Sequence, residues 1–357
     1  MKTALIGIGQ AGGKLAEQII QFDQEKGYDA VRDAVAINSA KADLKELAID
    51  TLLIGQTRVA GQGVGGDNEL GAEIMEEYVE QVQEKLSTHI TSEAESIILI
   101  AGLGGGTGSG GTPVLARRLK EIYDIPVYVF GILPGTDEPN LAQINAGRSL
   151  KTVTDTADAT LLAANNAWKS TGESLSEGYE AINKAIAQRI GLLLAAGEVS
   201  HDVAESVVDS SEVINTLRSG GIAAIGYNQV VAGDSTQDNI NTVTTATRSA
   251  LRSGLSLTGD MTAEAGLLIV AGKPDKISRK GVEKSRRWLE EETESMQVRG
   301  GDFPIDSEYI ASLVLLGDIQ SSERIESFFE RAKEAAAAPS EQDDSEKMFQ
   351  NDNIDGV

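Results

Sequence analysis

Short apolar runs alternate with amphipathic stretches through the first half of the chain. Each run suits a buried strand, and each stretch between runs repeats its apolar positions at the three- and four-residue spacing of a helix. The predicted strands are Thr3–Ile8, Ala34–Asn38, Thr51–Gly55, Ser96–Gly102, Pro126–Leu133 and Ala159–Ala164. The predicted helices between them include Gln10–Lys26, Glu69–Leu86 and Thr112–Tyr123. This alternation predicts an α/β domain with an open, doubly wound parallel sheet.

A long apolar helix pattern follows over Gly178–Ala196, about 28 Å at the helical rise per residue, enough to join two domains. Beyond it the order of patterns changes and predicts a smaller C-terminal α+β domain. Its predicted helices are His201–Ser219, Thr242–Ser253, Gly281–Glu294 and Ser322–Ala337, and its predicted strands are Ile222–Val231, Gly266–Ala271, Met296–Phe303 and Ser307–Leu316. We expect a first domain over residues 1–175, a connecting helix over 176–200, a second domain over 201–337 and a disordered acidic tail over 338–357.

The composition narrows the possible chemistry. The 357 residues include no Cys and only two His, His89 and His201. Disulfide scaffolds, Cys-ligated zinc, iron–sulfur clusters, thiol nucleophiles and His-rich metal sites are therefore excluded. The apolar run that begins at Ala4 is too short for a signal peptide, and no segment reaches the roughly 18 consecutive apolar residues of a membrane span. We expect a soluble, cytoplasmic protein with no membrane-inserted segment.

The charge balance is strongly acidic, with 55 acids against 31 bases and a formal net charge of −24. Residues 339–357 hold six acids and one Lys, so −19 remains on the rest of the chain. Such a surface argues against nucleic acid or an anionic membrane as a partner. Because molar salt shortens the Debye length to about 3 Å and screens self-repulsion, adaptation to a salt-rich cytoplasm explains this charge. An ordinary acidic protein is the alternative.

A first glycine loop, Gly7–Lys14, directly follows the first predicted strand. Gly7, Gly9 and Gly12 match the pattern G-x-G-x-x-G, in which small residues let backbone N–H groups and a helix N-terminus approach phosphate. A dinucleotide site would also have an acid after the second strand, where this chain has Asn38. A tight strand-to-helix turn without a ligand is the alternative.

A second glycine loop, Gly102–Gly111, holds seven glycines in ten residues, more than we expect packing to require. We expect the following helix to begin near Thr112, with Pro113 in its first turn. The loop would then form a nest of N–H donors around a triphosphate, joined by the hydroxyls of Thr107 and Ser109.

A third glycine loop, Gly61–Glu69, precedes the predicted helix Glu69–Leu86. Asp67, Asn68 and Glu69 either cap that helix or face a phosphate-bound Mg²⁺ through water. The sequence leaves both interpretations open.

In this context the segment Gly104–Gly110 resembles the signature loop of the tubulin/FtsZ superfamily of GTP-binding, filament-forming proteins. The resemblance covers residues 1 to about 335 and is closest to the archaeal CetZ group. It implies a tubulin-like fold and the ligands GTP or GDP, with Mg²⁺ held through phosphates and water, and with Asp67 or Glu69 as candidate partners of the metal. The phosphate-side residues that it implies are Gly9, Gln10, Ala11, Gly12, Gly13, Lys14, Asn38, Gly66, Asp67, Asn68, Gly104, Gly105, Gly106, Thr107, Gly108 and Ser109.

The same resemblance implies contacts to the nucleoside. Glu138 and Asn140 look like tubulin's ribose-binding segment, and Asn165 falls where the family places a guanine-recognising Asn. Tyr179 and Asn183 are similar to tubulin's Tyr-x-x-x-Asn, in which the ring stacks on the base and the amide reads its edge. Their four-residue spacing places both side chains on one helix face.

The superfamily also implies that the next subunit supplies the acids that orient the attacking water. Asp209 and Glu212 match the family's Asp-x-x-Asp/Glu pair, and their spacing predicts one face of a helix. The family's Asn two residues before the Asp is Val207 here. The alternative is that both acids are ordinary solvated carboxylates.

The implied function is a GTPase that polymerises head to tail, since an active site divided between subunits needs a contact that does not close on itself. Its expected partners are guanine nucleotide and further copies of the chain, with a partner of the tail unidentified. Control of cell shape is implied, with cell division as the weaker alternative. Two other functions stay open: a nucleotide-bound regulator that does not polymerise, and an NAD-dependent oxidoreductase built on the first glycine loop.

Overall fold

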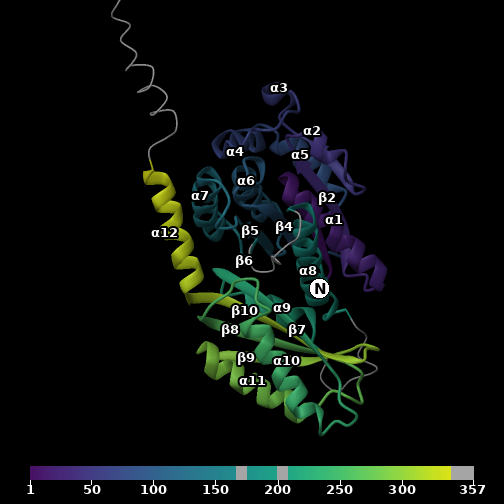
Figure 1. Ribbon diagram of the computed structural model, residues 1–357. Helices are drawn as coiled ribbons and strands as arrows, with labels where there is room; N and C mark the ends of the chain where they lie inside the picture. Colours follow the sequence, from purple (N-terminus) through teal and green to yellow (C-terminus); the bar gives the residue numbers. More distant parts are fainter. Residues whose placement is uncertain (166–174, 199–207, 339–357) are drawn as a thin grey trace, which may run out of the picture.

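The first half of the chain forms six parallel strands joined by helices, in the order β3-β2-β1-β4-β5-β6 (Figure 1). The computed structural model describes residues 1–165, 175–198 and 208–338. The strands are β1 (Thr3–Ile8), β2 (Val31–Asn38), β3 (Asp50–Leu53), β4 (Ser96–Gly102), β5 (Val127–Leu133) and β6 (Ala159–Ala164). The helices are α1 (Gly9–Lys26), α2 (Lys41–Leu44), α3 (Gln56–Val59), α4 (Asn68–Glu77), α5 (Val79–Ser87), α6 (Thr107–Ile122) and α7 (Asn140–Thr156). The predicted doubly wound sheet is confirmed.

The second half continues the same sheet. After the central helix α8 (Leu175–Ala195), strand β7 pairs with β6 over only two residue pairs, and β10, β8 and β9 complete ten strands. The strands are β7 (Ile222–Val231), β8 (Met261–Gly272), β9 (Gln297–Pro304) and β10 (Tyr309–Ser322), and the helices are α9 (Ser210–Leu217), α10 (Asn239–Arg252), α11 (Arg279–Thr293) and α12 (Glu323–Ala337). Figure 1 shows α10 and α11 on the side of this half that lies away from the parallel strands, and α12 beside α7. The predicted α+β character is confirmed, while the domain boundaries stay predictions.

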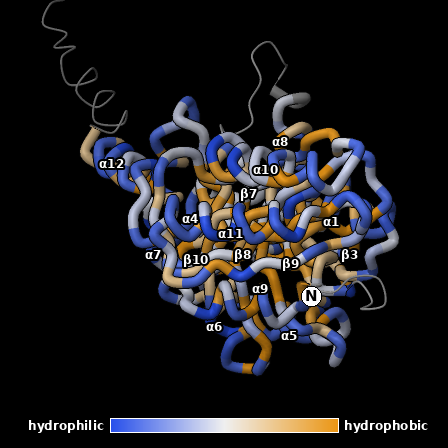
Figure 2. The backbone as a smooth tube through the Cα atoms, turned by 90° about the horizontal axis from the view of Figure 1, so that it is seen from below, coloured by the Kyte–Doolittle hydropathy of each residue, from blue (hydrophilic) through white to orange (hydrophobic). Residues whose placement is uncertain are grey.

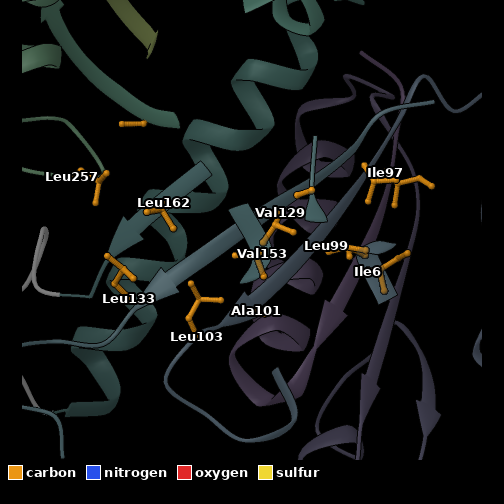
Figure 3. Close-up of a cluster of buried hydrophobic side chains, with 14 of the residues drawn as sticks. Ile6, Ile97, Leu99, Ala101, Leu103, Val129, Leu133, Val153, Leu162 and Leu257 are labelled. Atoms are coloured by element: carbon orange, nitrogen blue, oxygen red, sulfur yellow. The ribbon is translucent and has the colours of Figure 1, made fainter. Parts of the chain in front are cut away.

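The core lies on both faces of the sheet because alternate residues of each strand point to opposite sides. In β4, Ile97 and Leu99 join one buried cluster, whereas Ile98 and Ile100 join the other. Helices cover both faces, which is why the parallel strands are apolar throughout. Figure 2 shows the hydrophobic segments gathered in the interior, and Figure 3 shows one cluster spanning β1 to β6. No helix among the described residues is long and apolar enough to cross a membrane.

Several elements differ from the sequence predictions, among them the unpredicted short helices α2 and α3 and strand β10, which ends at Ser322 rather than at Leu316. Helix α7 was not predicted, the predicted helix Glu69–Leu86 is two helices that meet at Tyr78, and β8 begins five residues before its predicted start at Gly266. Helix α6 begins at Thr107 rather than near Thr112. The predicted helix start at His201 and the predicted tail lie outside the described residues.

Candidate functional site

A cavity of about 890 Å³ opens at the carboxyl ends of the parallel strands. It lies where β1 and β4 are neighbours and the connections on either side run in opposite directions, the usual ligand position in an open α/β sheet. The predicted site residues that line it are Gly9, Gln10, Ala11, Lys14, Asn38, Gly66, Gly104, Gly105, Gly106, Thr107, Gly108, Glu138, Asn165, Tyr179 and Asn183. The fold therefore gathers residues from seven separate segments around one space.

Two helices begin at this cavity without a side-chain cap. Helix α1 starts at Gly9 and α6 at Thr107, and neither preceding residue accepts a side-chain hydrogen bond from the first turn. By contrast α4, α9, α11 and α12 are each capped by an Asp or Ser side chain. The first turns of α1 and α6 therefore present backbone N–H groups and positive helix ends to an anion in the cavity.

Some residues of the first glycine loop line the cavity, whereas others are glycine because the backbone packs closely there. A side chain on Gly12 would place its Cβ 2.0 Å from the carbonyl oxygen of Ile100, and one on Gly7 would reach the carbonyl oxygen of Gly12 at 2.4 Å. Gly13 likewise faces Leu47 rather than the cavity. Gly7 and Gly12 thus let α1 pass closely over β1 and β4, and neither Gly12 nor Gly13 lines the predicted phosphate site.

The second glycine loop is shorter than predicted because α6 includes Gly108, Gly110 and Gly111. A Cβ on Gly110 would lie 2.0 Å from the carbonyl oxygen of Asn68 in α4, so these two helices touch through backbone. The expectation that packing does not account for so many glycines is wrong for this segment. The part that lines the cavity is Gly104–Gly108.

Because α6 begins early, Pro113 lies inside the helix instead of in its first turn. A proline has no N–H, so the carbonyl of Ser109 loses its usual helical donor. The hydroxyl of Ser149 in α7 donates to that carbonyl at 2.8 Å, and Ser149 is buried. A neighbouring helix therefore replaces the missing hydrogen bond behind the phosphate loop.

Ser149→Ala should lower the free energy of unfolding by about 1–2 kcal/mol, since the carbonyl of Ser109 then has no donor. Thr152→Ala is the matched control, because that exposed hydroxyl bonds only to the carbonyl of Arg148. We expect the control to cost less than about 0.5 kcal/mol. Urea unfolding measures both, and equal effects of the two variants would contradict the role given to Ser149.

Asn145 of α7 ties two glycine loops together. Its Nδ2 donates to the carbonyl oxygens of Gly66 at 2.7 Å and Gly104 at 3.2 Å, and its side chain is buried. Sequence reasoning missed Asn145 and Ser149 because it did not predict α7. The signal was present in Ala142, Ala146 and Val153, whose helical spacing begins directly after Pro139.

A polar network closes the cavity beside the first loop. Gln10 and Asn38 donate to the two carboxylate oxygens of Asp43 at 3.2 and 2.9 Å. Thr107 and Ser39 share a hydrogen bond of 2.7 Å between their hydroxyls. Sequence reasoning also missed Asp43, a lining residue on the single-turn helix α2.

The opposite end of the cavity carries the predicted nucleoside residues. Oε1 of Glu138 accepts from Nδ2 of Asn165 at 2.9 Å and from the backbone N–H of Gly135 at 2.7 Å. This bond orients the amide of Asn165, which leaves its Oδ1 as an acceptor. Tyr179 and Asn183 line the same end from α8.

Five further predicted residues do not line the cavity. Asp67 caps α4 by accepting from the N–H of Leu70, and Glu69 pairs with Arg148 at 3.2 Å. The hydroxyl of Ser109 donates to the loop carbonyls of Gly105 and Gly106. The other two are Asn68, in the first turn of α4, and Asn140, the exposed first residue of α7.

Asp209 and Glu212 lie at the other end of the parallel strands. Asp209 precedes α9 and caps it by accepting from the N–H of Glu212 at 3.1 Å, so the expectation that both acids lie on a helix face is wrong for Asp209. The hydroxyl of Ser210 donates at 2.9 Å to Glu95, which immediately precedes β4. Because β4 has seven residues, about 23 Å separates these acids from the second glycine loop.

The carboxylate of Glu212 has an unusual environment for a surface acid. Burial of the side chain, followed by the nearby charge of Asp209, raises the pKa of Glu212, while Arg299 of β9 opposes this shift. A partly desolvated carboxylate is costly to keep at a surface without a use. Val207, the departure from the family pattern, lies outside the described residues.

Comparison with known proteins gives consistent matches over the whole chain. The model described as tubulin/FtsZ family, GTPase domain, matches residues 2–173, and the tubulin-like CetZ C-terminal domain matches residues 172–334. Tubulin-like protein CetZ2 of Haloferax volcanii is 60% identical over 359 aligned positions that cover 100% of both chains. A GTPγS-bound protofilament of CetZ2 from that organism has a TM-score of 0.91 at 61% identity, covering 94% of this chain and 98% of the other. A GDP-bound monomer of its CetZ1 has a TM-score of 0.87 at 45% identity, covering 94% and 100%.

Proposed function

The chain belongs to the tubulin-like CetZ proteins of the tubulin/FtsZ family, and on this premise we propose that it is a GTPase whose active site forms between adjacent subunits of a head-to-tail filament. The observation that supports this most directly is the separation of the phosphate cavity from Asp209 and Glu212 by the length of β4. One chain cannot close this gap. A second copy stacked along the strands can, and such a heterologous contact repeats without closing.

We assign phosphate binding to the backbone N–H groups at the start of α1 and α6, which need no side chain and therefore suit the glycine-rich lining. Guanine recognition falls to Asn165 and Asn183, with the ring of Tyr179 against the base. Because the amide of Asn165 donates to Glu138, its Oδ1 is available for the N–H donors of a guanine edge. Asp209 and Glu212 of the adjacent subunit orient the water that attacks the terminal phosphate.

The cavity is acidic apart from one lysine. Lys14 pairs with Glu46 at 3.2 Å, and the carboxylates of Asp43 and Glu138 also line the space. A triphosphate therefore needs a cation, and Mg²⁺ would offset the charge that develops on its oxygens. No group of three or more potential metal-ligating side chains gathers within the described ranges, which suits a metal held mainly by phosphates and water.

Asp43 is better placed than Asp67 or Glu69 to face such a metal through water. It lines the cavity and is fixed by Gln10 and Asn38, whereas Asp67 caps α4 and Glu69 is 80% exposed beside Arg148. Asp43→Asn should raise the Mg²⁺ concentration needed for half-maximal GTPγS binding about tenfold, by loss of one charge-assisted contact. Binding is measured by calorimetry across a Mg²⁺ series. Glu46→Gln is the control, and an equal shift in that variant would contradict the assignment.

Filament formation is tested by sedimentation and light scattering with GTP, GDP and GTPγS at molar salt. We expect filaments with GTP, longer-lived filaments with GTPγS, and none with GDP. If GTP binds but no nucleotide produces a sediment, the chain is instead a nucleotide-bound regulator. Family membership leaves no support for the NAD-dependent oxidoreductase.

Assembly should depend steeply on salt because the subunits carry a formal charge of −24. At about 0.1 M salt the Debye length is near 10 Å and two such surfaces repel, whereas above about 1 M it is near 3 Å. We expect little sediment at the lower concentration and efficient assembly at the higher one. Sucrose of equal osmolality, which does not screen charge, serves as the control. Efficient assembly at about 0.1 M salt would contradict the salt-adapted interpretation.

We propose control of cell shape as the cellular role, with cell division as the alternative. The group to which the chain belongs supports this role. A variant of Glu212, one of the two acids at α9, tests it. Cells that express Glu212→Gln in place of the native protein should contain persistent filaments and altered outlines. A normal outline with blocked division would favour the alternative.

A further inference from the structure

A second pocket, of about 420 Å³, lies at the amino ends of the parallel strands, whereas the nucleotide cavity lies at their carboxyl ends. Its residues come from the end of α6 and the turn before β5 (Lys120, Tyr123, Asp124, Ile125, Pro126), from β5 and the start of β6 (Tyr128, Asp158), and from α9 (Ile214, Leu217, Arg218). Tyr128 is 1% exposed and lines this pocket. The pocket thus combines apolar side chains, such as Ile125, Ile214 and Leu217, with a charged rim in which Lys120 and Asp158 pair at 2.8 Å.

The nucleotide cavity and this pocket lie at the two ends of the same strand. Ile132 and Pro134 at the carboxyl end of β5 line the cavity, whereas Pro126 and Tyr128 at its amino end line the pocket. Seven residues of strand place the two about 23 Å apart. β4 runs parallel beside β5, with the phosphate loop at one end and the acids of α9 near the other.

An exposed leucine stands at the nucleotide end of β5. Leu141, the second residue of α7, is 52% exposed and packs against Gly66 of the glycine loop. Its neighbour Ala142 contacts Gly104 beside the phosphate site. A large apolar side chain so close to an acidic cavity has no packing role that needs this exposure.

The acids and the pocket lie side by side at the amino ends of β4 and β5, as the phosphate loop and Leu141 do at the carboxyl ends. Along helix α9, Glu212 precedes the pocket residues Ile214 and Arg218 by two and six residues, about 3–9 Å, with the acids beneath β4 and the pocket beneath β5. On the other face the phosphate loop follows β4, and Leu141 lies beyond β5. A copy whose acids reach the phosphate loop therefore brings its pocket over Leu141.

We propose that Leu141 of one subunit inserts into the pocket beneath β5 of the next subunit, so that this contact sets the register in which Glu212 meets the phosphate. The inference rests on the proposed head-to-tail assembly and names the side chains that align it. Both contacts use the same helix, α9, which couples the fit of the leucine to the placement of the acids. The relative that forms a protofilament supports a second copy as the occupant.

Cysteine cross-linking of the full chain tests this contact, because the native sequence has no Cys. The pair Leu141→Cys with Ile214→Cys, assembled with GTPγS at molar salt and mildly oxidised, should give a ladder of covalent oligomers on a non-reducing gel. The control pair is Leu141→Cys with Val231→Cys. Val231 is exposed at the far end of β7 and should give no ladder. Leu141→Ala in a separate sample should raise the critical concentration about tenfold or more, because a buried leucine is lost from every contact.

The outcomes separate the inference from the function on which it rests. Filaments of the Cys pair without a ladder, or an unchanged critical concentration in Leu141→Ala, overturn the contact and leave the GTPase filament intact. Absence of filaments from the wild-type chain overturns the proposed function and this inference with it. A ladder from the control pair also overturns the assignment, since it would place Leu141 elsewhere.

Discussion

Glu212→Gln should reduce GTP hydrolysis on the order of 10²-fold or more while nucleotide binding and assembly persist. Glu212 lies about 23 Å from the phosphate cavity of its own chain, so its loss cannot weaken nucleotide binding directly. A positioned carboxylate that handles the attacking water accounts for a loss of this size. Phosphate release and sedimentation at molar salt measure the two effects, and we expect filaments that last longer than those of the wild type.

The stability of this variant separates catalysis from folding. Because the pKa of Glu212 is raised, the folded chain binds its proton more tightly than the unfolded chain, and the ionised carboxylate lowers stability at neutral pH. This penalty disappears when the pH falls below the pKa of an unfolded glutamate. Gln removes the charge, so the thermal midpoint should be unchanged or higher. For the same reason, hydrolysis by the wild type should begin to fall on acidification at a higher pH than for an ordinary glutamate.

Asp209→Asn is the companion variant, because asparagine caps a helix about as well as aspartate. It should keep α9 in place while it removes the second charge. Unchanged phosphate release in Glu212→Gln under conditions that assemble filaments would contradict the catalytic assignment.

Gly105→Ala should fold normally and lose most of its nucleotide affinity, whereas Gly110→Ala should be strongly destabilised. A Cβ on Gly105 meets nothing nearer than the carbonyl oxygen of Gly102 at 3.9 Å, so the methyl group enters the open cavity that Gly105 lines. The loss of one or two charge-assisted N–H contacts weakens binding by about ten- to a hundredfold. A Cβ on Gly110 lies 2.0 Å from the carbonyl oxygen of Asn68 and forces α4 from α6, at a cost of about 3 kcal/mol or more.

Calorimetric titration with GTPγS and thermal unfolding of the variants without nucleotide separate the two glycines. Both substitutions add one methyl group, and the two positions lie only five residues apart, in the second glycine loop and in α6. Normal nucleotide affinity in Gly105→Ala would contradict the phosphate assignment of the second loop. Normal stability in Gly110→Ala would contradict the close packing of α4 and α6.

The sequence predicted the parallel half well because its signals are local. Apolar strands such as Ser96–Gly102 end at glycines, and both features are visible without knowledge of the fold. Helix α7 was not predicted because it buries Gln143, Asn145 and Ser149, polar side chains that interrupt the apolar pattern and bond to backbone carbonyls of neighbouring segments. The remaining local signal, the helical spacing of Ala142, Ala146 and Val153 after Pro139, was therefore overlooked.

The start of α6 shows a second limit. Pro113 normally marks a first turn, and the structure overrides this preference because Ser149 supplies the donor that proline lacks. Asp43 was not predicted as a site residue, because only the tertiary fold brings α2 to the cavity. The family resemblance supplied Asp209 and Glu212, but their separation from the cavity could be recognised only once the strands had been placed.

The claim that the active site forms between subunits is tested most directly by single-turnover hydrolysis in mixed filaments. Subunits carrying Glu212→Gln are loaded with γ-labelled GTP and mixed at molar salt with wild-type subunits that hold unlabelled GTP, in the presence of excess unlabelled GTP that dilutes any released label. If the acids act on the neighbouring nucleotide, the label on the variant is hydrolysed after mixing with wild type and persists after mixing with more variant. If mixed filaments form and the label stays intact with both partners, each subunit hydrolyses only its own GTP and the divided active site is wrong.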